Sequence, residues 1–154
     1  MSDWKLPWRA SCLCGQIEMK ITEPPVVSMA CHCRGCQKLT SGPYSLSLLV
    51  PSSGFEVVCG APVIGGLHGE HRQFFCDHCK SWLFTRPNGL DAFVNVRATM
   101  LEDPGWVVPI VDIATADKLP QVASGAEHSF EDFPAADVFQ PLIQEFAQSG
   151  ARPS

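Results

Sequence analysis

The chain has 154 residues, of which 45% are hydrophobic and 18% are charged, and its formal net charge is −5. This length and composition are typical of one globular domain, here residues 1–154, and they exclude an intrinsically disordered chain. The acidic balance, with no Lys/Arg run, argues against a protein that binds nucleic acid through a basic face.

No run of about 18 apolar residues occurs, so no membrane-spanning helix and no membrane partner are predicted. Residues 1–7 show no basic start followed by an apolar stretch, so we expect no secretory signal and a cytoplasmic protein. Thiols stay reduced in that compartment, and next-but-one cysteines make poor disulfide partners. We therefore expect the eight cysteines to bind metal rather than to form four disulfides.

Alternating apolar and polar residues, bounded by Gly and Pro, predict a series of short strands. The predicted strands are 17–21, 26–30, 44–50, 55–58, 72–76, 81–85 and 92–96. We expect 44–50 and 55–58 to be consecutive antiparallel strands. The turn 76–79 is expected to join the two strands beside it into a hairpin.

The last third of the chain carries recurrent prolines, which leave room only for short elements. The segment 141–147 is predicted to be a helix that begins with Pro141 at its first position. Its apolar face consists of Leu142, Ile143 and Phe146. Helix is therefore expected to be the minority structure.

Four cysteines come as two closely spaced pairs, Cys12/Cys14 and Cys76/Cys79, far apart in the sequence. A closed tetrahedral zinc site is usually assembled from two such pairs, with four ligands and no open position. The site would tie the N-terminal strand to the tip of the predicted hairpin, with metal binding worth on the order of 10 kcal/mol. We expect structural zinc at this four-cysteine group, the alternative being that one pair consists of ordinary turn cysteines.

Three further cysteines, Cys31, Cys33 and Cys36, form a second group that we call the cysteine triple. No packing requirement explains this density of thiols, whereas a thiophilic metal does. Three thiolates leave one position of a Zn²⁺ ion vacant, which is how catalytic zinc accepts water or substrate. A thiol that enters there is deprotonated and becomes a nucleophile. Gly35 is expected to supply the turn that brings Cys36 back toward Cys33.

Two alternatives for the triple remain open. One is a redox pair formed by Cys33 and Cys36. The other is a second structural zinc, completed by one of four residues: Cys59, His32, His68 or His71.

Less specific roles are expected for the other residues near the two cysteine groups. Cys59 ends an apolar strand and is expected to be a small buried hydrophobe. His68 and His71 lie in a glycine-rich loop that could bring an acid, a base or a ligand to the triple. Arg34 and Lys38 could meet a carboxylate of the substrate or could simply face solvent.

The order of the cysteine motifs resembles one protein family. Segments 11–15, 31–36 and 75–81, followed by 116–120, 128–130 and 133–134, are similar to the glutathione-dependent formaldehyde-activating enzyme family, which includes centromere protein V. The resemblance covers a core of about residues 10–134 and leaves a C-terminal tail, 135–154. Lys80 stands where members generally carry glycine.

The resemblance implies a mainly β fold of the Mss4-like type, with zinc-stapled antiparallel β-sheets and few short helices. It implies two zinc ions per chain, a structural one on Cys12, Cys14, Cys76 and Cys79 and a catalytic one on Cys31, Cys33 and Cys36. The implied activity is that of a carbon–sulfur lyase that joins glutathione and formaldehyde into S-(hydroxymethyl)glutathione. The alternative is a non-catalytic module that binds zinc or a thiol.

Overall fold

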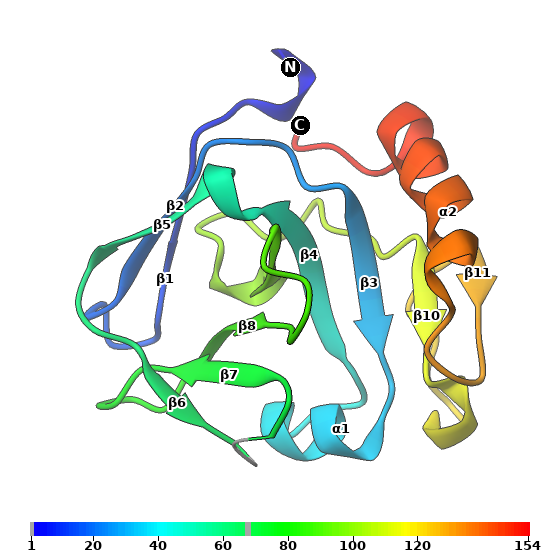
Figure 1. The fold of residues 1–154 in the computed structure, drawn as a ribbon, viewed down its shortest axis with the longest axis horizontal. Coiled ribbons are helices and arrows are strands. Elements are labelled where there is room, and N and C mark those ends of the chain that lie inside the picture. The colour runs from blue at the N-terminus through cyan, green and yellow to red at the C-terminus, as the bar shows by residue number, and fades with distance from the viewer. Residues whose placement is uncertain (1, 67–68) are drawn as a thin grey trace.

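The computed structural model describes residues 2–66 and 69–154, and within these ranges eleven strands and two α-helices form the fold (Figure 1). The mainly β prediction is confirmed. The strands are β1 (Trp8–Ser11), β2 (Glu18–Ile21), β3 (Val27–Cys31), β4 (Ser45–Pro51), β5 (Phe55–Cys59), β6 (Val63–Gly65), β7 (Arg72–Phe75), β8 (Trp82–Arg86), β9 (Phe93–Arg97), β10 (Val111–Ile113) and β11 (His128–Ser129). The helices are α1 (Arg34–Thr40) and α2 (Ala136–Ser149), with short 3-10 turns at Ser2–Trp4, Ser52–Gly54, Ala98–Met100 and Thr115–Asp117.

The strands form a small sheet in the order β1-β2-β5 and a large sheet in the order β11-β10-β3-β4-β9-β8-β7-β6. The small sheet stands at one side of the molecule, and α2 covers the opposite side (Figure 1). Most neighbours are antiparallel, as predicted, but β10 runs parallel to both β3 and β11. The large sheet is therefore mixed, because β10 returns to the far edge of β3 through a long connection rather than a hairpin.

The predicted pairing of segments 44–50 and 55–58 is wrong, although both segments form strands, β4 and β5. β4 lies between β3 and β9 in the large sheet, whereas β5 pairs with β2 in the small one. The turn Ser52–Gly54 carries the chain from one sheet to the other. A Cβ atom on Gly54 would lie 2.5 Å from Cβ of Glu23, so the crossing needs glycine for close approach of the two segments.

Two clusters of buried side chains stabilise this arrangement. The larger includes residues of both sheets, among them Met19 and Ile21 of β2 and Val94 and Val96 of β9. The smaller lies between α2 and strands β3 and β10, and includes Phe146.

Helix α2 differs from the predicted helix in length and in the position of its proline. The helix begins at Ala136, so Pro141 lies inside it instead of at its first position. A proline there removes a single backbone donor from the helix. Burial of Leu142 and Phe146 against β3 stabilises the helix across that defect, and the predicted apolar face is confirmed.

Candidate metal centres

The four-cysteine group joins the two sheets. Cys12 and Cys14 lie in the connection between β1 and β2 of the small sheet, and Cys76 and Cys79 lie in the turn between β7 and β8 of the large sheet. The predicted hairpin is confirmed, because β7 and β8 pair antiparallel on either side of this turn. A metal ion bound by this group would thus cross-link the two sheets as well as two distant segments.

The sulfur positions in this group fit a tetrahedral metal. Sγ of Cys14 lies 3.5 Å from Sγ of Cys12 and 3.7 Å from Sγ of Cys76. Four sulfurs at about 2.3 Å from a zinc ion would lie roughly 3.8 Å apart, whereas a disulfide needs about 2.05 Å. All four ligand atoms lie within 4.8 Å of one another and all four cysteines are free, so the group could hold a metal ion such as zinc.

Backbone N–H groups and a serine hydroxyl contact the sulfurs of this group. The N–H of Ile17 donates to Sγ of Cys12 at 3.3 Å, and the N–H of Cys79 approaches Sγ of Cys76 at 3.5 Å. Contacts with the Ser81 hydroxyl and N–H lower the pKa of Cys79 to about 5. The Ser81 hydroxyl also accepts a hydrogen bond from the N–H of Leu13 at 3.2 Å, so it links the two cysteine pairs.

Replacing Lys80 by glycine is expected to raise the free energy of unfolding by about 1 kcal/mol. Lys80 follows the last cysteine with φ of 61°, a left-handed conformation that costs a non-glycine residue roughly 1–2 kcal/mol. Urea unfolding measures the change. Lys80→Ala is the control, since it removes the same exposed ion pair with Asp77 but keeps a Cβ atom. Equal stability of the two variants would contradict this expectation.

The cysteine triple lies where β3 ends and α1 begins. Cys31 is the last residue of β3, Cys33 is the N-cap of α1 and Cys36 lies in its first turn. Sγ of Cys33 accepts a hydrogen bond from the N–H of Cys36 at 3.3 Å. Gly35 does not supply a special turn, contrary to expectation, because it lies inside α1 and is not among the residues with positive φ. The helix itself brings Cys36 back toward Cys33.

The three sulfurs of the triple lie within 4.8 Å of one another and could hold a metal ion. Hydrogen bonds from the thiols of Cys31 and Cys36 lower the pKa of Cys33 to about 2. The contacts with Cys33 and Cys36 raise the pKa of Cys31. A cation that binds all three sulfurs must displace the thiol protons.

Among residues 2–66 and 69–154, no fourth cysteine, histidine or carboxylate joins this group. His32 is buried, with Nε2 2.8 Å from Oδ1 of Asp112, because neighbouring residues of an extended chain face opposite sides. His71 is exposed, and His68 lies outside the described residues. Cys59 is exposed rather than buried as expected, since β5 is an edge strand of the small sheet.

The two basic residues beside the triple point into solvent or along their own helix. Arg34 is exposed and donates from Nη1 to Oε1 of Gln37, and Lys38 is also exposed. Nε2 of Gln37 in turn donates to the backbone oxygens of His32 and Asp117, at 2.7 and 2.9 Å. These bonds fix α1 against the end of β3.

Two residues near the triple were missed by sequence reasoning. The Ser45 hydroxyl donates to Sγ of Cys36 at 3.1 Å. Ser45 and Ser47 are 1% and 2% exposed, so both serines of this alternating strand are buried. Arg97 is 5% exposed at the end of β9. A charged residue directly after the mostly apolar segment 92–96 was the available signal for it.

Burial lowers the pKa of Arg97 to about 10, while negative charge on Cys36, Cys31 and Cys33 acts in the opposite direction. The guanidinium therefore stays positively charged at neutral pH. Its positive charge interacts with the thiols of the triple.

A third cluster consists of Glu127, His128 and Glu145, whose ligand atoms also lie within 4.8 Å of one another. Nε2 of His128 lies 2.9 Å from Oε2 of Glu145, and the cluster is partly exposed. This pair links β11 to α2, which accounts for the cluster without a metal.

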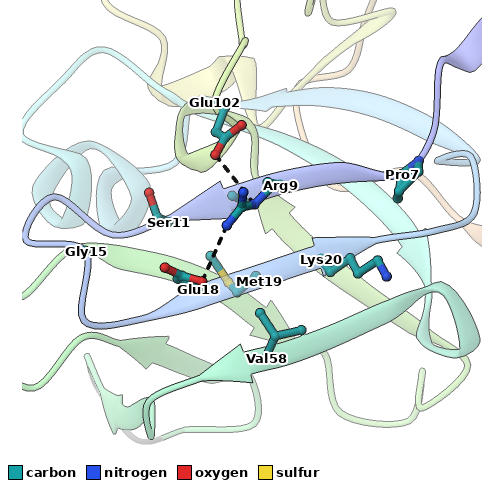
Figure 2. Close-up of a pocket in the computed structure, with 10 residues that line it drawn as sticks. Pro7, Arg9, Ser11, Gly15, Glu18, Met19, Lys20, Val58 and Glu102 are labelled. Atoms are coloured by element: carbon teal, nitrogen blue, oxygen red, sulfur yellow. Dashed lines mark ion pairs between the residues drawn. The ribbon is translucent and has the colours of Figure 1, made fainter.

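A cavity of about 410 Å³ lies on the outer side of the small sheet (Figure 2). Arg9 projects there between Glu18 and Glu102, with 3.8 Å in each ion pair. Ser11 and Gly15, which flank the first cysteine pair, line its edge. This cavity is therefore adjacent to the four-cysteine group and includes none of the triple.

The described helices include none that is long and apolar enough to cross a lipid bilayer.

A family model described as glutathione-dependent formaldehyde-activating enzyme matches residues 7–117. The match includes both cysteine groups and confirms the resemblance carried by the cysteine motifs. Among solved structures, the crystal structure of a Rhodobacter sphaeroides protein is similar, with a TM-score of 0.52 and 18% sequence identity over 61% of this chain and 87% of that chain. At this identity the likeness shows the fold alone. The comparison with curated proteins gives no match.

Proposed function

Because this chain belongs to the glutathione-dependent formaldehyde-activating enzyme family, we propose that it is a carbon–sulfur lyase that adds a thiol such as glutathione to an aldehyde. The reaction takes place at the cysteine triple. The protein would hold two zinc ions, one that stabilises the fold and one that takes part in the reaction.

The four-cysteine group holds the structural zinc. Four thiols at tetrahedral spacing leave no position for a substrate, and the two pairs come from different sheets. The role of Cys12, Cys14, Cys76 and Cys79 is therefore to hold the small sheet against the β7–β8 hairpin.

The observation that carries the proposal is the number of thiols in the triple. Cys31, Cys33 and Cys36 come together without a fourth candidate ligand from the described residues. These three thiolates would hold a zinc ion, and an ion with an open position would supply acidification of a substrate thiol, which favours the nucleophilic thiolate. The hydrogen bond from Ser45 stabilises negative charge on Cys36, and the N–H of Cys36 does the same for Cys33.

The proposed reaction is an addition that needs no oxidant. The substrate thiol gives up its proton, and the sulfur forms a bond to the carbonyl carbon of the aldehyde. The π electrons of the carbonyl group move to its oxygen, which takes up a proton to give the hydroxymethyl thioether. The reverse reaction breaks the same carbon–sulfur bond.

A non-catalytic module that binds zinc or a thiol is the second candidate. The cavity on the small sheet favours such a module, because this cavity lies next to the four-cysteine group and includes no residue of the triple. The two candidates differ in turnover, since a module binds the thiol without accelerating its addition to an aldehyde.

We expect the zinc-loaded protein to accelerate exchange between free glutathione and its formaldehyde adduct. Exchange NMR with ¹³C-labelled formaldehyde measures the rate. The Cys59→Ser variant is a matched control, because Cys59 is an exposed cysteine outside both groups, and it should retain the full rate. If protein that holds two zinc ions per chain leaves the exchange rate unchanged, the proposal that it is an enzyme is refuted. Thiol binding without faster exchange would establish the module instead.

A further inference from the structure

Arg97 is a buried cation with no carboxylate partner among the residues that the structure describes. It ends β9, between β4 and β8 in the large sheet, and none of the ion pairs within residues 2–66 and 69–154 involves it. A buried charge without a counter-charge is strongly destabilising. The position of Arg97 therefore requires a source of negative charge other than Asp or Glu.

The strand register places that source at the triple. Arg97 pairs with Ser47 across β4, and Ser45 lies two residues further along the same face. Ser45 pairs in turn with Cys31 across β3, and its hydroxyl donates to Sγ of Cys36. Arg97 and the triple thus share one face of the sheet, and the triple provides the missing negative charge.

Three contacts hold the guanidinium in place. It lies over the ring of Trp82, with Cζ 4.0 Å from the ring centroid. Its Nη2 donates to Oγ1 of Thr85 and to the backbone oxygen of Asn95, both at 3.3 Å. Nε is buried and has no hydrogen-bond partner among the described residues. The charge is therefore fixed in position while the Nε–H group stays unpaired.

The charge of the triple explains what a fixed cation does there. Three thiolates and one zinc ion carry one net negative charge, and a fourth thiolate would raise this to two. Gathering a second negative charge in a partly buried site is unfavourable without a nearby cation. A neutral fourth ligand meets no such barrier.

We propose that Arg97 is a specificity-determining residue that makes the triple select an anionic fourth ligand, a thiolate, over a neutral one. This inference rests on the proposed function, because it takes the triple to hold a metal ion with an open position. It predicts that the charge of residue 97, and not its hydrogen bonds, sets the preference.

The test compares binding of two probes to cobalt-substituted protein, whose visible and near-ultraviolet absorption reports the fourth ligand. The probes are 2-mercaptoethanol, which binds as a thiolate, and imidazole, which binds as a neutral ligand. Arg97→Met is expected to weaken binding of 2-mercaptoethanol about tenfold or more relative to imidazole, a difference of about 1.4 kcal/mol. Arg97→Lys keeps the charge and should keep the ratio of the two affinities within about threefold of wild type.

Arg86→Met is the matched control. Arg86 is another arginine over aromatic rings, with Cζ 5.7 Å from the centroid of Phe84, but it lies at the end of β8, and no thiol is among its contacts in the described structure. Its replacement should leave the ratio unchanged. Circular dichroism and cobalt content verify that each variant is folded and loaded.

The outcomes separate this inference from the proposed function. If wild-type protein binds neither probe, the open position does not exist and both proposals fail. If wild type binds the thiol and Arg97→Met does so with an unchanged ratio, only the role of Arg97 is refuted. If Arg97→Met does not fold, Arg97→Lys carries the test, because a lost preference in a variant that keeps the charge overturns the inference.

Discussion

Replacing Cys76 by serine is expected to lower the free energy of unfolding by several kcal/mol or to abolish soluble expression. Cys76 is 1% exposed, and the four-cysteine group lies between the segment that joins β1 to β2 and the β7–β8 hairpin. Structural zinc contributes on the order of 10 kcal/mol in small zinc peptides, and that contribution is folding free energy. The loss of one of four ligands therefore weakens the cross-link between the two sheets.

Urea unfolding and zinc content of the purified variant measure the effect. The zinc content should fall from two ions to one per chain. Cys59→Ser removes an exposed thiol at the end of β5 and should leave both quantities unchanged. A Cys76→Ser protein that has lost one zinc ion and yet unfolds at the wild-type urea concentration would show that the four-cysteine group does not stabilise the fold.

The Cys33→Ser variant is expected to lose activity while its fold survives. Cys33 lies in a local segment between β3 and α1, and Cys31 and Cys36 remain in place. Serine is itself a favoured N-cap residue, so it can still accept the hydrogen bond from the N–H of Cys36. We expect a loss of stability of about 1 kcal/mol, one zinc ion fewer per chain, and adduct exchange at the uncatalysed rate.

The comparison of Cys33→Ser with Cys76→Ser under the same conditions decides between two roles of the triple. If both variants unfold equally readily, the triple is structural and the non-catalytic module is the better proposal. If Cys33→Ser keeps full activity after losing its second zinc ion, the chemistry lies elsewhere. His71, the exposed histidine in the loop before β7, would then be the next residue to replace.

The cysteines of both candidate metal centres could be grouped from the sequence because their spacing is largely a local property. Cys31, Cys33 and Cys36 lie on one strand end and one helical turn, so their thiols meet wherever that segment lies. The hairpin around the Cys76/Cys79 pair is similarly local. Pairing with Cys12 and Cys14 is not local, but two closely spaced pairs have the composition of a closed tetrahedral site.

The strands could be located but their neighbours could not. Segments 44–50 and 55–58 are strands, yet alternation does not reveal that a three-residue turn sends β5 into the other sheet. The parallel pairing of β10 with β3 joins segments that are far apart in the chain. Pro141 predicted the start of a helix, and only packing of α2 on β3 explains a helix that passes through it.

The sequence by itself determined the two cysteine groups, the mainly β class and the family, since each follows from residue types at short spacing. The tertiary structure alone decided the surroundings of the triple. It turned His32 toward Asp112, left Cys59 exposed, and buried Ser45 and Arg97 on the face of the sheet that carries Cys31. The physical reason is that burial and charge environment depend on which strands become neighbours, and that choice is made by contacts between segments distant in the chain.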